Sequence, residues 1–511
     1  MELKINREML NVSESIYDGS QEQSVELDYI LPDYCPDIFR LVKCCVTPSV
    51  VSWSINDNIL SYELLADIRI LYCSENSPAV QCINQKMTFN KTLRLESSPT
   101  SPVASLIPKT DHINCRAVNQ RRIDMRGAVS VKIRVTGERP QEVVCDIFGM
   151  NSQVRKKPVE FASKKLCASK QLSVSEDFEL NASDKPVSVI AKVSASAEVT
   201  EKKIIANKLV VKGEAKIGVL YSSGDGLETI RFPVAFSQIV DMEGLDDSFL
   251  CSVSAEAVSC DITPCADSSG DTRILKCELR INLGCQAVKS ISAELVTDVY
   301  STSYPCEYAV SKLKLQHAPS ERNDVIQKKV SIESGGVFEC IYDVWCTPKN
   351  INTAIDPENG CICISGMLEY CVMYKGEGGM PAVTEKSEAF EHKLEAEGIT
   401  ESSCAELNVN SCDCTYTIAS PESVSVSAEL KISGCIRLCD SVEAVTEVTF
   451  DDSVKKIRDG DYALKLYYGI EGEDVWEIAK RYSTSVRAVM EENELDSELL
   501  SESGMLLIPI V

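Results

Sequence analysis

The sequence of 511 residues has few aromatic residues, few histidines and no long apolar run. Phe, Trp and Tyr together make up only 6% of the chain. No apolar stretch reaches the ~18 residues that a membrane-spanning helix needs, so we expect no transmembrane segment. Residues 1–21 mix charged and apolar side chains, which predicts no secretory signal peptide. A cytoplasmic origin is therefore expected.

Motifs for catalysis or metal binding are also missing. None of the 3 histidines has a Cys-x-x-Cys or His-x-x-x-His partner of the kind that zinc sites use. There is no Gly-x-x-x-x-Gly-Lys-Ser/Thr phosphate loop and no Gly-x-Ser-x-Gly elbow. We predict no enzyme, no cofactor and no metal.

The 24 cysteines are interpreted as small hydrophobic residues of buried strands, because thiols stay reduced in the cytosol. Two Cys-x-Cys pairs, Cys361 with Cys363 and Cys412 with Cys414, place both thiols on one face of a strand. We favour packing over metal binding for both pairs. Oxidation in a finished external shell stays open.

Basic residues are the minority charge. The chain has 52 Lys and Arg against 77 Asp and Glu, a net charge of −25. Nucleic acid and anionic membrane surfaces would be repelled by this field. A basic partner protein would be attracted by it.

Three long segments share one pattern. They are residues 59–72, 208–221 and 361–374, and apolar or small residues alternate with others along each. This period of two is typical of a strand with one face on a core. Each segment ends at a turn rich in Gly, Asn or Asp, which predicts a hairpin.

A second pattern recurs with the same period. Residues 129–133, 277–281 and 428–432 read apolar, polar, apolar, basic, Ile. Its copies are 148 and 151 residues apart, and those of the first pattern are 149 and 153 residues apart. Because two independent landmarks share one spacing, we predict a mainly β fold with three repeated domains.

Two connecting segments differ in composition from the repeats. Residues 151–171 are Lys-rich and are interpreted as a solvated linker or edge strand, with a docking patch as the alternative. Residues 315–324 are rich in turn formers and predict a second linker.

The last fifty residues predict a strand, two helices and a strand. Asp474 and Ser485 are suitable N-caps for helices at 475–482 and from 486 to about 493, and strands are expected at 462–468 and 504–509. Apolar side chains recur on neighbouring helical turns and form the expected core. This core comprises Trp476, Ile478, Ala479, Tyr482 and Ile508.

This terminal segment resembles a LysM module, through Gly472-Glu-Asp474, Trp476-Glu-Ile-Ala-Lys-Arg-Tyr482, Asn493-Glu-Leu495 and Leu507-Ile-Pro509. The resemblance implies a shallow groove that binds N-acetylglucosamine polymers. From residue 461 onward, however, eleven acidic residues stand against four basic ones, which suits a basic protein surface better. The groove residues that the resemblance implies are Gly472, Glu473, Asp474 and Val475 on one side, and Asn493, Glu494 and Leu495 on the other.

The chain as a whole resembles the SipL-like spore coat morphogenetic proteins of clostridia, which combine SPOCS domains with a C-terminal LysM domain. The opening SVELDYILPDYCPDIFRLV (residues 24–42), the repeated long strand, the Lys-rich joint and the terminal module carry the resemblance. It implies a coat assembly scaffold that is made in the mother cell cytoplasm, assembles at the forespore surface and binds the coat ATPase SpoIVA through its LysM domain. The alternative is a protein that binds peptidoglycan of the wall or cortex.

The domain organisation expected from these patterns begins with an N-terminal segment that contains the LPDYCPDI turn. Three SPOCS-like repeats follow, separated by two linkers, and a LysM domain ends the chain. In order, the expected boundaries are 1–42, 43–150, 151–185 (linker), 186–303, 304–325 (linker), 326–452 and 461–511.

Overall fold

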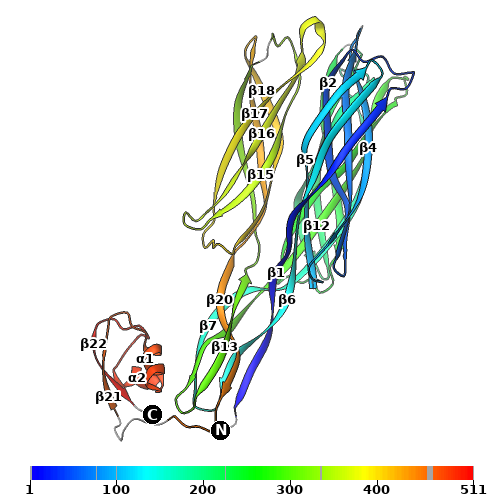
Figure 1. The fold of residues 1–511 in the computed structure, drawn as a ribbon. Helices are drawn as coiled ribbons and strands as arrows, with labels where there is room; N and C mark the ends of the chain where they lie inside the picture. The colour runs from blue at the N-terminus through cyan, green and yellow to red at the C-terminus, as the bar shows by residue number, and fades with distance from the viewer. Residues whose placement is uncertain are drawn as a thin grey trace.

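The computed structural model describes residues 3–509 except 76, 99, 225, 334–335 and 457–463. The chain is mainly β, as expected. Three elongated pairs of sheets lie above a narrow stalk, and a small unit with two helices lies beside that stalk (Figure 1). Residues 461–463, the expected start of the terminal domain, lie outside the described residues. No described helix is long and apolar enough to span a bilayer.

The first pair of sheets packs around one core, and we call it the first sandwich. Its sheets have the orders β2-β3-β4 and β1-β6-β5, and all neighbours are antiparallel. The strands are β1 (Lys4–Ile30), β2 (Arg40–Asn56), β3 (Ile59–Ser74), β4 (Ser77–Arg94), β5 (Thr100–Asn119) and β6 (Arg122–Phe148).

The second sandwich repeats this arrangement. Its sheets have the orders β8-β9-β10 and β7-β12-β11, so each strand has the same neighbours as its counterpart in the first sandwich. The strands are β7 (Ser152–Glu179), β8 (Val189–Ile205), β9 (Lys208–Ser222), β10 (Leu227–Asp241), β11 (Leu250–Ala266) and β12 (Thr272–Ser301).

The third sandwich has the orders β15-β16-β17 and β14-β19-β18, again with the same neighbours. Here the long first and last strands are each interrupted, so that β13 and β20 form a separate ribbon. The elements are β13 (Cys306–Gln316), β14 (Ser320–Glu333), β15 (Ile341–Asp356), β16 (Cys361–Lys375), η1 (Glu377–Gly379), β17 (Pro381–Glu395), β18 (Cys404–Ser420), β19 (Ser423–Arg437) and β20 (Cys439–Phe450).

The three segments with period-two patterning are the central strands β3, β9 and β16. Their alternate residues point into the cores, which agrees with the burial of one face of a strand. Each strand ends with a tyrosine on that face, and Tyr72 and Tyr221 donate their hydroxyls to the carbonyl oxygens of Pro36 and Lys185 at 3.2 Å. Leu64, Ala66, Ile68 and Ile70 in β3, Ala215, Ile217 and Val219 in β9, and Leu368, Tyr370 and Val372 in β16 are buried.

Beyond the sandwiches, three two-stranded ribbons come together in the stalk. The ribbons are residues 4–12 with 139–148, residues 152–162 with 290–301, and residues 306–316 with 439–450. Two apolar clusters hold them together, and each cluster receives side chains from all three ribbons. The segments expected as linkers, 151–185 and 304–325, therefore largely form β7, β13 and the start of β14. They form strands because their apolar residues face these cores. Strand β7 lies at the edge of its sheet, which agrees with the edge-strand alternative for residues 151–171.

Each ribbon contains a bulge at an equivalent place. Cys145, Thr297 and Thr446 lack a partner on the neighbouring strand, where the register shifts by one residue. A bulge reorients the side chains that follow it. In the second ribbon, the following residues Asp298 and Tyr300 face the terminal unit.

The terminal unit, residues 464–509, has the expected order of elements. Strand β21 pairs with β22 in an antiparallel ribbon, and two short helices connect them. The bounds are β21 (Leu464–Gly469), α1 (Val475–Tyr482), α2 (Val486–Glu492) and β22 (Gly504–Pro509).

Candidate docking site

Helix α1 begins and ends through defined caps. The Oδ1 atom of Asp474 accepts a hydrogen bond from the backbone N–H of Trp476 at 2.9 Å, which is the expected N-cap. Ser483 adopts the left-handed conformation and ends the helix. Val475, Ile478 and Ala479 are fully buried, so one side of α1 forms the core of the unit.

Asn493 connects helix α2 to strand β22. Its Nδ2 atom donates to the carbonyl oxygens of Val489 and Leu507, at 2.8 and 2.7 Å. Its Oδ1 atom accepts from the backbone N–H of Leu507 at 2.7 Å. The polar groups of this side chain therefore hold the unit together.

The loop before α1 pairs with the segment before β22. Gly472 N–H donates to the carbonyl of Leu500, Leu500 N–H donates to the carbonyl of Glu473, and Val475 N–H donates to the carbonyl of Glu498. The carboxylate of Glu473 accepts from the hydroxyl of Tyr467 at 2.5 Å. This side of the expected groove thus has most of its polar groups in internal hydrogen bonds.

The carboxylate of Asp298 in the stalk binds two side chains of α1. Asp298 in β12 accepts from Nε1 of Trp476 at 2.8 Å and from Nζ of Lys480 at 2.7 and 2.8 Å. Lys480 also donates to the hydroxyl of Tyr308 in β13 at 3.2 Å. Burial alone would raise the pKa of Asp298, but hydrogen bonds from Lys480, Trp476 and Tyr308 hold its pKa below the usual value.

Further contacts surround this carboxylate. Arg155 in β7 donates to Oδ2 of Asp474 at 2.7 Å. The ring of Tyr300 meets that of Trp476 edge to face, with centroids 5.0 Å apart, and its hydroxyl donates to the carbonyl of Thr484 at 2.8 Å. We call Asp298, Arg155 and Tyr300, with their partners Asp474, Trp476, Lys480 and Thr484, the latch.

A cavity of about 640 Å³ lies between the stalk and helix α2. Gln153 and Val154 of β7 form one wall. Apolar side chains of the terminal unit form the floor, and charged ones form the rim. The floor residues are Trp476, Val486, Met490 and Leu495, and the rim residues are Arg487, Glu491, Glu494, Asp496 and Glu498.

The structure brings only part of the expected groove to this cavity. Glu494 and Leu495 line it, whereas Gly472, Glu473, Asp474, Val475 and Asn493 do not. Of the expected core, Trp476, Ile478, Ala479 and Ile508 are buried, and Tyr482 packs against them. Trp476 also contacts the stalk, and the sequence analysis did not predict this contact.

Sequence reasoning did not identify Asp298, Tyr300 or Arg155. A signal for Asp298 was present: the segments Glu142–Ile147, Glu294–Val299 and Glu443–Val448 share the pattern Glu, apolar, Val, Cys or Thr, acidic, apolar. They are 152 and 149 residues apart, which is the period of the other two landmarks.

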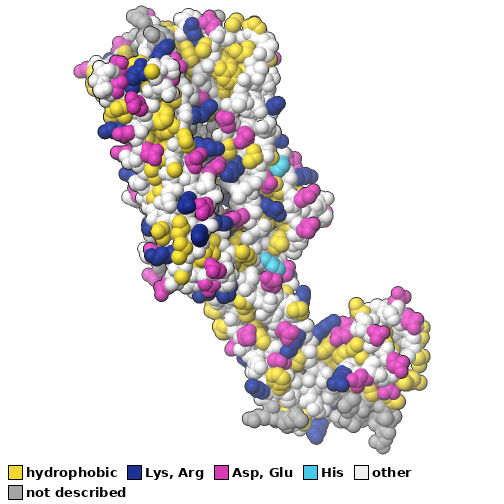
Figure 2. Space-filling view, turned by 180° about the vertical axis from the view of Figure 1, so that it is seen from behind, with side chains coloured by type: hydrophobic (Ala, Val, Ile, Leu, Met, Phe, Trp, Pro, Cys, Tyr) yellow, Lys and Arg dark blue, Asp and Glu magenta, His cyan; other side chains and the backbone are white. Residues whose placement is uncertain are grey.

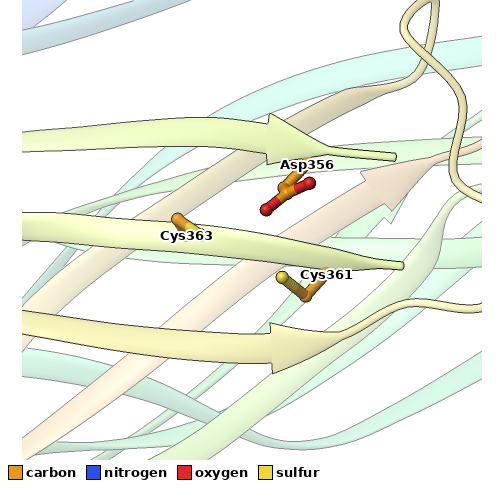
Figure 3. Close-up of side chains that lie close together, drawn as sticks. All are labelled: Asp356, Cys361 and Cys363. Atoms are coloured by element: carbon orange, nitrogen blue, oxygen red, sulfur yellow. The ribbon is translucent and has the colours of Figure 1, made fainter. Parts of the chain in front are cut away.

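A separate group of possible metal ligands lies at the β15–β16 hairpin of the third sandwich. Asp356 ends β15, and Cys361 and Cys363 begin β16, so the hairpin places one carboxylate and two thiols within 4.8 Å of one another (Figure 3). Burial, followed by the neighbouring thiol of Cys363, raises the pKa of Cys361. Asp356 accepts two hydrogen bonds from Asn359 in the turn. Packing rather than metal binding stays our prediction for this pair.

Comparison with known families assigns one part of the chain. Residues 186–263 match the family described as SipL, SPOCS domain. The matched segment corresponds to strands β8, β9, β10 and most of β11 in the second sandwich. No curated protein and no solved structure matches the chain. The match associates the chain with the sporulation proteins that carry this domain, and it covers neither the other sandwiches nor the terminal unit.

Proposed function

We propose that this chain is a non-catalytic scaffold of the spore envelope, built from three SPOCS-like domains and a C-terminal LysM domain. The observation that carries the proposal is the family match in the second sandwich, together with the identical strand order of the first and third sandwiches. Three sandwiches that share one strand order, and whose sequence landmarks recur at one spacing, are best explained as copies of one unit.

We propose domain boundaries that differ from those expected from the sequence. The first strand of each sandwich lies in a segment that the sequence assigned to an N-terminal segment or a linker. We therefore place the three copies at residues 4–148, 152–301 and 306–450. The LysM domain occupies the remaining described part of the chain, and its order of strand, helix, helix and strand supports this assignment.

In this proposal, the terminal unit docks a protein of the coat, such as the SpoIVA-like ATPase that the resemblance implies. Acidic side chains are spread over the face of this unit that Figure 2 shows, and few basic ones accompany them. The stem peptides of peptidoglycan carry carboxylates, which such a surface repels. A basic protein surface is the better electrostatic match. The scaffold would act in the mother cell cytoplasm and assemble at the forespore surface.

The test is binding of the purified full chain to two ligands. We expect capture of the purified coat ATPase by the immobilised chain, and no cosedimentation of the chain with insoluble peptidoglycan at 150 mM salt, about the physiological ionic strength. Strong cosedimentation without ATPase capture would replace the scaffold with the wall-binding alternative.

A further inference from the structure

The cavity beside helix α2 is built by two distant parts of the chain. Gln153 and Val154 of the stalk line it together with residues of the terminal unit such as Met490 and Leu495. Its volume of about 640 Å³ lies within the range of ~300–1,000 Å³ that is typical of ligand clefts. The stalk therefore contributes one part of this cleft, and the terminal unit contributes the rest.

The rim of the cleft is acidic. Arg487 forms an ion pair with Glu491 of its own helix at 2.6 Å. Among the described residues, no cation pairs with Glu494, Asp496 or Glu498. Three carboxylates thus surround a floor of apolar side chains. An occupant that matches both features carries positive charge next to large apolar groups.

The latch determines the position of the stalk wall. Asp298 binds Trp476, which itself lines the cleft, and Arg155 is two residues from Gln153 and binds the N-cap of α1. A ligand that touches both walls binds the docked arrangement better than the undocked one. By thermodynamic linkage, loosening the latch must then weaken ligand binding.

We propose that the stalk completes this cleft, and that the cleft binds an extended protein segment with alternating basic and large apolar side chains. This proposal rests on the proposed function and specifies the chemistry of the partner. The latch residues Asp298 and Arg155 act as positioning residues, because they hold the stalk wall against the terminal unit. The opposite arrangement, in which the stalk covers a binding face, predicts that loosening the latch strengthens binding.

The first experiment measures fluorescence anisotropy of the labelled peptide Gly-Lys-Leu-Lys-Phe-Lys-Leu-Lys-Gly with the full chain. We expect binding that weakens at least about tenfold when Leu and Phe are replaced by Ser, and that disappears when Lys is replaced by Glu. The double variant Glu494→Lys with Asp496→Lys should lose about tenfold or more. Its control has the same net charge and carries Glu243→Lys with Asp247→Lys, two exposed positions in the second sandwich. Equal loss in both double variants would overturn the site.

The second experiment loosens the latch. Asp298→Asn keeps the side-chain shape and removes the charge that binds Lys480, so peptide affinity should fall about three- to tenfold. The control is Asp146→Asn, the equivalent residue of the first ribbon, which binds Lys156 at 2.7 Å and should change affinity less than about twofold. Arg155→Gln breaks the other ion pair of the latch and should repeat the result of Asp298→Asn.

The outcomes separate this inference from the proposed function. Unchanged or tighter peptide binding in Asp298→Asn and Arg155→Gln overturns the composite cleft, even where ATPase capture persists. Peptide binding that depends on the rim and the latch, without capture of the ATPase by the wild-type chain, supports the cleft and refutes that partner.

Discussion

Replacing Asp298 by alanine should release the terminal unit from the stalk without unfolding either part. The substitution removes one hydrogen bond from Trp476 Nε1 and two from Lys480 Nζ. The core of the terminal unit should stay intact. Val475, Ile478 and Ala479 form this core through apolar packing and do not depend on the carboxylate of Asp298.

The magnitude follows from the surroundings of the two donors. The carboxyl of Asp298 is 16% exposed, and a hydrogen bond to such a charged group contributes about 1.5–3 kcal/mol. The side chain of Lys480 is 31% exposed, so solvent screening reduces its share to about 1 kcal/mol or less. A loss of about 2–3 kcal/mol follows, which lowers the docking equilibrium roughly 30- to 150-fold.

Acrylamide quenching of Trp476 measures this release. A background with Trp53→Phe and Trp345→Phe leaves Trp476 as the one tryptophan, and its 4% exposure predicts weak quenching in the docked state. Asp298→Ala should increase quenching several-fold while far-ultraviolet circular dichroism stays the same. Asp146→Ala serves as the control. Unchanged quenching, or an equal effect of both substitutions, would refute the role of this carboxylate.

Three further predictions concern single groups. The folded structure lowers the pKa of Asp298, so its contribution to docking should be complete above the usual pKa of 3.8 and lost as the pH falls through the lower folded pKa. Quenching of Trp476 should therefore rise in this acidic range, and Asp298→Asn should abolish this pH-dependent rise. In Gly213→Ala, the new Cβ would lie 2.2 Å from the ring of Phe236 and 2.3 Å from the backbone carbonyl oxygen of Glu198. The second sandwich should therefore lose about 1–3 kcal/mol in urea unfolding. Phe236→Leu should recover only the part that comes from the ring, because the clash with the backbone stays. Tyr300→Phe removes the hydrogen bond to Thr484 and should weaken docking by about 1 kcal/mol, measured by the same quenching assay; no change would mean that the hydroxyl contributes nothing net.

Local patterns were sufficient to predict much of the fold. The alternation in residues 59–72, 208–221 and 361–374 identifies the central strands, because a strand with one buried face needs apolar residues at every second position. The caps Asp474 and Ser485 identify the starts of both helices, because exposed backbone N–H groups need an acceptor there. These features depend on neighbours within a few residues.

The stalk and the latch could not be predicted in the same way. Residues 151–171 are basic enough to suggest a solvated linker or an edge strand, and they lie in the edge strand β7. Arg155 and Lys156 of this strand are paired with Asp474 and Asp146. The segment forms a strand because it pairs with β12. Its partners there lie more than a hundred residues away in the sequence, so local composition cannot reveal this pairing. Helical spacing identifies Trp476 as a core residue of its own unit. It cannot reveal the contact of Trp476 with Asp298 in another part of the chain.

The terminal unit contacts the second ribbon through Asp298, Tyr300 and Arg155, and it contacts the third ribbon through Tyr308, which accepts from Lys480. Differences between the ribbons explain why Trp476 and the N-cap of α1 lie on the second one. Docking needs a carboxylate for Trp476 and Lys480, an aromatic ring two residues later, and a cation for the N-cap of α1. The second ribbon provides all three, because Asp298 is followed by Tyr300 and lies opposite Arg155. In the first ribbon, Asn6 lies opposite the equivalent carboxylate, and in the third ribbon Ala309 does. The three ribbons share a backbone arrangement that could accept the unit, and differences at a few side chains determine where it docks.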